Sequence, residues 1–361
     1  MNIPPPMALI AELTHRCPLQ CSYCSNPLDL DRAKDELSTG DWLRLMDEAA
    51  ALGVLQVHFT GGEPMARRDL VRLIAHASSR GLYTNLITSG VSLTDAVMGA
   101  LASAGIDHIQ ISFQDVEPAS ADRLGGYRGG HARKLEAARR IREAGVSLTA
   151  NFVVHRHNAA RVAGMIALGE ALGVDRIEIA HVQYHGWALL NRTALLPTRD
   201  QLDQCTAEVT AARMRLSGVL TIDYVIPDYY ASRPKACMGG WGRRVINISP
   251  SGKALPCHAA ESLPGLVFPS VREHSLGDIW ARSGAFARFR GTDWMPSPCR
   301  TCDQREIDWG GCRCQALALT GDAGAVDPAC VFSPDHALMG AAVTAAMAEE
   351  KVSTPRRHVK G

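Results

Sequence analysis

A loop with three closely spaced cysteines near the N-terminus constrains this chain most. Cys17, Cys21 and Cys24 follow a C-x3-C-x2-C spacing within Leu13–Pro27. Three thiolates fall one short of a closed tetrahedral zinc site, and they cannot all pair as disulfides. They can hold three corners of a [4Fe–4S] cube, since cysteine thiolates are the usual cluster ligands, and the fourth iron would be open to another ligand. A structural zinc knuckle and reduced core cysteines are the alternatives.

The composition sets the environment in which this loop is expected to work. The net charge of the 361 residues is +1, with 38 basic and 37 acidic side chains, so we expect neither nucleic acid nor an anionic membrane as a partner. No apolar run approaches the ~20 residues of a membrane span, and the first residues lack the pattern of a signal peptide. Eleven cysteines in such a chain favour metal ligation in a reducing, cytoplasmic compartment over a disulfide framework.

Apolar periodicity predicts six strands, each followed by a helix, over the first 216 residues. Strands with near-continuous apolar character and helical connections predict a buried parallel sheet with right-handed crossovers. An open doubly wound sheet and a barrel both satisfy this pattern. The expected strands are 7–14, 54–60, 82–88, 106–113, 146–154 and 176–180, and the expected helices are 39–51, 69–79, 94–104, 131–144, 158–172 and 198–216.

Unusual polar residues follow several of these strands, where parallel folds bind their ligands. Gly61-Gly62-Glu63-Pro64 follows the second strand; paired glycines permit close approach of a ligand to the backbone, and Glu63 can accept a hydrogen bond from an ammonium group. Ordinary strand-end turns are the alternative for all of these positions. The other candidates are Ser89, Ser112, Gln114 and, more weakly, Asn151.

A second group of cysteines occupies the C-terminal third of the chain. Its seven members are Cys237, Cys257, Cys299, Cys302, Cys312, Cys314 and Cys330. Seven thiolates cannot complete two four-ligand sites, but Asp308 lies between two cysteine pairs and a carboxylate can bind iron. A zinc ribbon made by Cys299/Cys302 and Cys312/Cys314 is the alternative, although ribbons usually repeat C-x2-C rather than C-x-C.

The cysteine loop followed by Gly61–Pro64 resembles the radical S-adenosylmethionine (radical SAM) enzymes. The resemblance implies that the amine and carboxylate of SAM fill the open iron site, and that SAM is split into methionine and a 5′-deoxyadenosyl radical. It places Tyr23 near the adenine, Gly61, Gly62, Glu63 and Pro64 at the methionyl amine, and Ser89, Ser112 and Gln114 at the ribose and carboxylate. The fold it implies is a partial (β/α)6 barrel within the α/β class.

The second cysteine group resembles the SPASM domain, an α+β extension that binds auxiliary iron–sulfur clusters. Gly252-x4-Cys257 and Cys299-x2-Cys302 fit its pattern, whereas Asp308 replaces a cysteine and Cys314 is an addition. This departure leaves open whether Asp308 or Cys314 completes a site. The partition we adopt gives two clusters of unassigned nuclearity: Cys237, Cys257, Cys312 and Cys314 hold one, and Cys299, Cys302, Asp308 and Cys330 hold the other.

The resemblance also divides the chain. Residues 1–220 are expected to form the radical SAM barrel, and residues 221–335 the smaller SPASM domain. Residues 336–361 are expected to form a terminal helix, running to Lys351, and a frayed tail.

Further segments narrow the resemblance to the radical SAM/SPASM enzymes of pyrroloquinoline quinone (PQQ) biosynthesis. They are Ser25-Asn-Pro-Leu28, Gln183-Tyr184, Gly186-Trp-Ala188, Asn191-Arg192 and Asp308. Such enzymes join a glutamate γ-carbon to a tyrosine ring in the precursor peptide PqqA, presented by the chaperone PqqD, and they need an external electron donor. Another SPASM peptide maturase, a sulfatase maturase and a zinc-stabilised binding protein are the alternatives.

Overall fold

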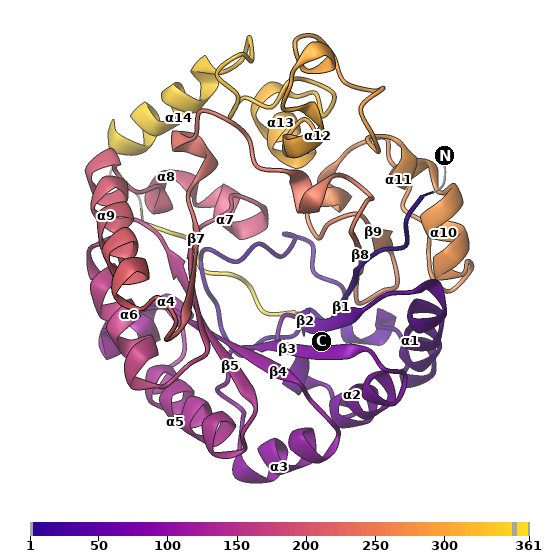
Figure 1. Ribbon diagram of the computed structural model, residues 1–361, viewed down its shortest axis with the longest axis vertical. Coiled ribbons are helices and arrows are strands. Elements are labelled where there is room, and N and C mark those ends of the chain that lie inside the picture. Colours follow the sequence, from indigo (N-terminus) through magenta and orange to yellow (C-terminus); the bar gives the residue numbers. More distant parts are fainter. Residues whose placement is uncertain (1–2, 349–351, 360–361) are drawn as a thin grey trace.

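A sheet of nine strands forms the frame of the computed structural model, which describes residues 3–348 and 352–359 (Figure 1). Its strand order is β7-β6-β5-β4-β3-β2-β1-β8-β9, and only the β8–β9 pairing is antiparallel. The strands are β1 (Ala8–Thr14), β2 (Gln56–Gly61), β3 (Tyr83–Thr88), β4 (His108–Phe113), β5 (Ser147–Val154), β6 (Arg176–His181), β7 (Thr221–Val225), β8 (Val245–Ile248) and β9 (Ala254–Leu255).

Helices cover the outer face of this curved sheet (Figure 1). They begin and end where the sequence provides caps: Ser38 and Asp41 form a capping box at the start of α1, and left-handed Gly53 ends it. The apolar face of each helix packs on strand residues such as Leu9, Phe59 and Leu86, which are fully buried. The outer helices are α1 (Thr39–Leu52), α2 (Leu70–Ser79), α3 (Asp95–Ser103), α4 (Pro118–Gly125), α5 (Gly130–Glu143), α6 (Val162–Ala171) and α9 (Arg199–Arg215). The predicted partial barrel is confirmed.

Within the first 220 residues, three short helices were not predicted: α4, α7 (Gly186–Leu190) and α8 (Arg192–Leu195). Each is too short to show a clear apolar period in the sequence. Helix α6 is also shorter than expected, because residues 159–161 form a separate 3-10 turn before it.

The sheet continues past residue 220, the predicted end of the barrel domain. Strand β7 pairs in parallel with β6, and β8 pairs in parallel with β1, so both flank the six predicted strands. The remaining C-terminal third is built of loops, 3-10 turns and the short helices α10 (Leu276–Arg282), α11 (Gly284–Ala287), α12 (Arg305–Asp308) and α13 (Arg313–Thr320). The domain boundaries at 220/221 and 335/336 remain predictions.

The terminal segment differs from the expected frayed tail. Helix α14 spans Ala337–Ala348, and the part of the predicted helix at 349–351 lies outside the described residues. Residues 352–359 run inside the ring of strands (Figure 1), and Arg356 is only 2% exposed. Hydrogen bonds from the side-chain amides of Asn191 and Gln20 to the backbone of this segment explain why it is ordered.

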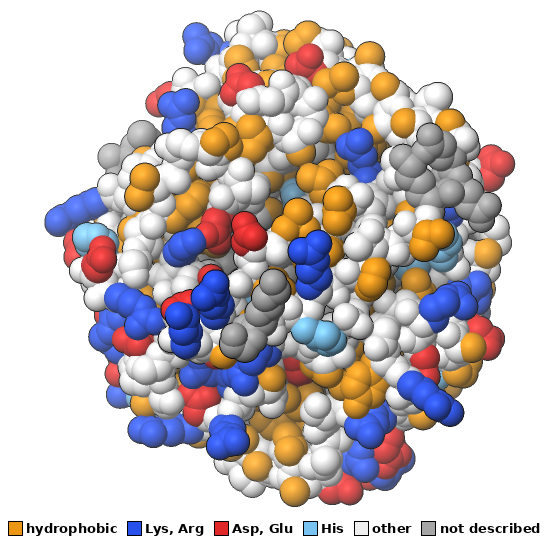
Figure 2. Space-filling model, turned by 180° about the vertical axis from the view of Figure 1, so that it is seen from behind, with side chains coloured by type: hydrophobic (Ala, Val, Ile, Leu, Met, Phe, Trp, Pro, Cys, Tyr) orange, Lys and Arg blue, Asp and Glu red, His pale blue; other side chains and the backbone are white. Residues whose placement is uncertain are grey.

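The outer surface carries both signs of charge. Figure 2 shows basic and acidic side chains interspersed over the rear face, as the net charge of +1 suggests. Within the described residues, no helix combines the length and the apolar character needed to cross a membrane.

Candidate functional site

The cysteine loop starts where β1 ends and is braced by the turn that follows β2. The amide of Gly62 donates to Thr14 O at 2.5 Å, and that of Glu63 donates to Arg16 O at 2.8 Å. A Cβ atom on Gly62 would lie 2.5 Å from Arg16 O and 2.6 Å from His15 O. Only glycine therefore lets the two backbones approach this closely, which gives Gly62 a steric role beside the cysteine loop.

A cavity of about 340 Å³ opens at the carboxyl ends of the strands beside this loop. It contains most of the predicted cluster and SAM residues, although they come from five different strands or loops. The predicted residues that line it are Cys17, Cys21, Cys24, Tyr23, Gly61, Gly62, Ser89, Ser112, Gln114 and Asn151. Glu63 and Pro64 are buried but do not line the cavity.

The carboxylate of Glu63 is held by hydrogen bonds from within the protein, and its expected contact with an ammonium group stays a prediction. Its carboxylate accepts hydrogen bonds from Thr88 Oγ1 at 2.7 Å, from Ser89 N at 2.9 Å, from Ser89 Oγ at 2.5 Å and from Met65 N at 3.1 Å. These four donors occupy the oxygens that we expected to accept from an ammonium group. Glu63 thus fixes the turn after β3, and through it the position of Ser89 in the cavity.

Two basic side chains that sequence reasoning missed lie close to the three thiols. Burial raises the pKa of Cys17 to about 12 and of Cys24 to about 11, and the guanidinium of Arg356 opposes this rise at both. Lys134 of α5 is 1% exposed and donates to Ser112 O at 2.5 Å. Burial lowers the pKa of Lys134 to about 8, while the thiol of Cys21 raises it. The site therefore places positive charge near the three cysteines, where it would stabilise thiolates and the carboxylate of a bound SAM.

Four of the C-terminal cysteines converge on one buried point. The thiols of Cys237, Cys257, Cys312 and Cys314 hydrogen-bond among themselves. These bonds hold the pKa values of Cys257 and Cys312 well below the usual range and those of Cys237 and Cys314 well above it. These four cysteines are the first predicted auxiliary ligand set, and we call this group the inner cysteine cluster.

His185 lies between the inner cysteine cluster and the barrel. Burial alone would lower the pKa of its imidazole, but the thiols of Cys312 and Cys257 and the carboxylate of Asp228 raise it, and the net shift is upward. His185 and His258 pack edge to face with ring centroids 5.8 Å apart, and both line a cavity of about 530 Å³ that reaches from Ser25 to Cys314. This cavity leads from the cysteine loop toward the inner cysteine cluster.

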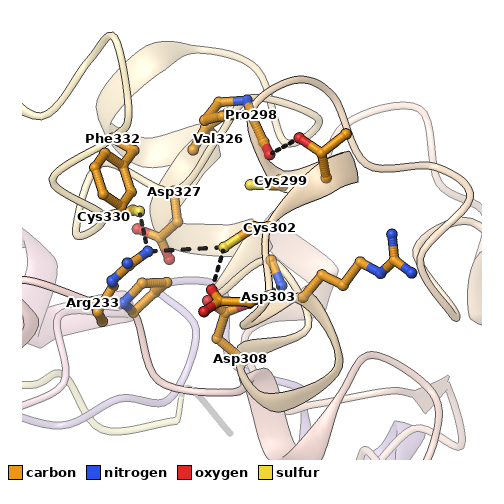
Figure 3. Close-up of a pocket in the computed structure, with 14 residues that line it drawn as sticks. Arg233, Pro298, Cys299, Cys302, Asp303, Asp308, Val326, Asp327, Cys330 and Phe332 are labelled. Carbon is orange, nitrogen blue, oxygen red and sulfur yellow. Dashed lines mark hydrogen bonds between the residues drawn. The ribbon is translucent and has the colours of Figure 1, made fainter.

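The second predicted ligand set lines a pocket of about 490 Å³ at the surface (Figure 3). Cys299, Cys302, Asp308 and Cys330 all face this pocket, which we call the outer cysteine pocket. Arg233 Nη1 lies 3.9 Å from the sulfurs of both Cys302 and Cys330. Burial raises the pKa of Cys299 to about 11, and the carboxylate of Asp308 adds to the rise. The four cysteines of the zinc-ribbon alternative are split between the two groups.

Asp327 connects the two groups of ligands and was not identified from the sequence. It is 1% exposed, and its carboxylate accepts from Cys312 N at 2.6 Å and from Ala329 N at 2.9 Å, next to Cys330. Burial raises the pKa of Asp327 to about 6, and the thiol of Cys312 adds to the rise. This carboxylate fixes the relative positions of the backbone segments that carry Cys312 and Cys330.

The donor sets fit iron–sulfur clusters by their chemistry: three thiols around one cavity, four thiols at a buried point, and three thiols with a carboxylate around a pocket. In residues 3–348 and 352–359, no group of three His, Cys, Asp or Glu side chains has the arrangement of a single-ion site. The assignment therefore rests on which side chains share each cavity.

Family models match both halves of the chain. Residues 11–168 match the radical SAM superfamily, and residues 237–303 match the SPASM iron–sulfur cluster-binding domain. The first match contains the cysteine loop and the Gly61–Pro64 turn, and the second contains Cys237, Cys257, Cys299 and Cys302.

The chain is also similar to solved structures of low sequence identity, which bear on the fold. SuiB of Streptococcus suis bound to S-adenosylmethionine has a TM-score of 0.76 at 20% identity, covering 92% of this chain and 79% of that one. The protein anSMEcpe with bound AdoMet has a TM-score of 0.65 at 12% identity, covering 96% of each chain.

Curated relatives are similar over almost the full length. A PqqA peptide cyclase of Granulibacter bethesdensis is 65% identical over 344 residues, which cover 95% of this chain and 92% of the relative. One from Gluconobacter oxydans is 57% identical over 359 residues, covering 99% and 100%. Because these relatives are 57–65% identical over nearly the whole chain and both family models match it, the chain belongs to the PqqA peptide cyclase family of radical SAM enzymes.

Proposed function

We propose that this protein forms a carbon–carbon bond between a glutamate γ-carbon and a tyrosine ring of the peptide PqqA, the first step of PQQ biosynthesis. The observation that carries the proposal is the 65% identity to a PqqA peptide cyclase across 95% of the chain. The three-cysteine cavity supports it independently, because it combines thiols for an open-site cluster with polar groups at the strand ends.

The reaction balances as a two-electron oxidation of the peptide. When bound, the [4Fe–4S] cluster and SAM together supply the 5′-deoxyadenosyl radical that abstracts hydrogen. The glutamate γ-carbon loses one hydrogen atom and bonds to the tyrosine ring, and the ring then loses one electron and one proton. The product is two hydrogens lighter than PqqA, and the SAM consumed becomes methionine and 5′-deoxyadenosine.

In this scheme the residues of the cavity bind and orient the cosubstrate. Cys17, Cys21 and Cys24 hold the cluster, and the narrow contact at Gly61 and Gly62 sets the backbone beside it. The other residues that we propose for the SAM site, as direct contacts or as supports, are Tyr23, Glu63, Pro64, Ser89, Ser112, Gln114 and Asn151. Glu63 acts by positioning Ser89, because its own oxygens are occupied.

We further propose two auxiliary clusters that accept the electron leaving the ring. We assign the inner cysteine cluster as the first acceptor, because a cavity of about 530 Å³ is lined both by Ser25 of the cysteine loop and by Cys314. We propose Asp308 as the fourth ligand in the outer cysteine pocket, and its position at the surface supports electron exchange with an external donor. Carboxylate in place of thiolate should alter the potential of that cluster, because ligand type is one of its determinants.

The partners in this proposal are PqqA, its chaperone PqqD and an external electron donor. A cytoplasmic location agrees with eleven cysteines that are all free in the structure.

The proposal is tested by anaerobic turnover of the reconstituted enzyme with SAM, reductant, PqqD and PqqA. Tandem mass spectrometry should show PqqA lighter by two hydrogens and linked from Glu to Tyr. A thioether or another linkage would instead assign the chain to a different peptide maturase. Colourless protein that contains zinc and no iron would support the zinc-stabilised binding protein.

A further inference from the structure

The C-terminal segment Thr354–His358 lies along the cysteine loop, although more than three hundred residues separate the two in sequence. Figure 1 shows the C-terminal segment inside the ring of strands. Arg356 bonds Gln20 and His358 Nδ1 bonds Cys17 O, both in the loop, whereas Thr354 bonds Asn191. Of these five residues, Arg356 alone is buried.

Side-chain amides hold the backbone of this segment. Thr354 N donates to Asn191 Oδ1 and Asn191 Nδ2 donates to Thr354 O, both at 2.7 Å. The same Asn191 amide donates to Ser22 O at 2.8 Å, inside the cysteine loop. Arg356 N donates a hydrogen bond to Gln20 O, and Gln20 Nε2 donates one to Arg356 O, both at 3.2 Å. Asn191 and Gln20 therefore tie the terminal segment directly to the loop that carries the three thiols.

Arg356 is the residue of this segment that reaches the cavity. Its guanidinium donates from Nη2 to His15 O at 2.5 Å, and the side chain lines the 340 Å³ cavity together with Cys17, Cys21 and Cys24. Its Nε is buried and has no hydrogen-bond partner among the described residues. A buried guanidinium with an unused donor is unfavourable unless an acceptor is present, and the thiols that share its cavity would hold a cluster rich in sulfur acceptors.

We propose that Arg356 is a positioning residue of the SAM cluster, whose positive charge and free Nε–H stabilise the reduced cluster, and that Thr354–His358 closes the cysteine loop over it. The physical basis is general. Net charge and hydrogen bonds to the sulfurs are among the determinants of a cluster's reduction potential, and a nearby cation favours the more negative, reduced state. The proposal deepens the proposed function, and rests on it only for the presence of the cluster and SAM.

The test compares the anaerobically reconstituted Arg356→Gln, Arg356→Lys and Arg357→Gln proteins with the wild type, without PqqA. Arg357 is the matched control because it is the exposed neighbour of Arg356. The SAM-dependent signal in electron paramagnetic resonance identifies the SAM cluster, and a redox titration of that signal gives the midpoint potential of this cluster. Iron per chain is measured on the same samples.

We expect Arg356→Gln to shift the midpoint potential of the SAM cluster to a more negative value, or to lose the iron of that cluster alone. Arg356→Lys should recover much of the potential, because it keeps the charge, and Arg357→Gln should match the wild type. Wild-type potential and iron content in Arg356→Gln would overturn the proposal. Faster SAM cleavage after truncation at residue 353 would also overturn the proposal, because it would show that the segment obstructs the site. Neither result depends on peptide crosslinking, so the proposal can fail while the proposed function stands.

Discussion

Replacing Gly62 by alanine tests how tightly the cysteine loop is fitted to the β2 turn. The new Cβ would lie 2.5 Å from Arg16 O, whereas ordinary contact begins at 3.4 Å. The loop would have to move by the difference, about 0.9 Å. The atoms that the new Cβ would clash with belong to the backbone and not to the ends of flexible side chains. The φ of Gly62 lies outside the left-handed region, so the cost is steric. Overpacking of this kind typically costs about 1–3 kcal/mol, which corresponds to roughly 5–150-fold in an equilibrium constant.

The expected result is a loss of SAM affinity and of 5′-deoxyadenosine formation within that range, because a displacement near 1 Å can itself reduce a rate by about 100-fold. The assay combines equilibrium dialysis with SAM and chromatography of the cleavage product, at matched iron content. Gly99→Ala is the control, since Gly99 lies in α3 with nothing within 4 Å of the added Cβ. If Gly62→Ala bound and cleaved SAM like the wild type, the steric argument for this glycine would be refuted.

Three further predictions follow from other contacts. Asp308→Cys should retain an auxiliary cluster but shift its reduction potential and the crosslinking rate, as measured by redox titration and turnover. Asp293→Asn, at an exposed carboxylate outside the pocket, should change neither value, and wild-type values for Asp308→Cys would refute a tuning role. Glu63→Gln should weaken SAM binding by roughly tenfold or more. The NH2 group of the new amide cannot accept hydrogen bonds, so two of the four donors that now bind the carboxylate would lose their acceptor. Glu143→Gln, at an exposed position, should have no effect on SAM binding. Burial lowers the pKa of His181 from 6.5 to about 4. Between these two values the unfolded state binds a proton that the folded state excludes. The free energy of unfolding should therefore fall by up to about 1.4 kcal/mol per pH unit as the pH is lowered from 6.5 to 4. Urea unfolding of the cluster-free chain measures this, and His181→Gln should lessen the dependence.

The sequence predicted the features that depend on short spacings. The cysteine loop and the Gly61–Pro64 turn are local patterns, and the structure places them together because β1 and β2 are adjacent parallel strands. The first helix was likewise predicted to within one residue, as 39–51 against Thr39–Leu52, because its apolar period is local.

Long-range contacts were the part that the sequence did not reveal. The bond between Arg356 and His15 joins positions 341 residues apart, and a basic tail on its own suggests a solvated end. Lys134 is one of several basic residues on α5, and only the packing of that helix on β4 buries it near Ser112. The pairing of β8 with β1 requires a chain return that no local pattern encodes. The hydrogen bonds from Thr88 and Ser89 to the carboxylate of Glu63 were likewise not foreseen, because they form only in the folded chain.

The most direct test of the account is a count of iron and of 5′-deoxyadenosine in the anaerobic protein. The wild type is predicted to bind iron at three sites and to cleave SAM when reduced. Alanine at Cys17, Cys21 and Cys24 should remove one cluster's iron and abolish 5′-deoxyadenosine, while Cys205→Ala, at a buried thiol far from the ligand sets in sequence, should do neither. Continued SAM cleavage by the triple variant, or wild-type protein without iron, would contradict the claim that these three thiols hold the reactive cluster.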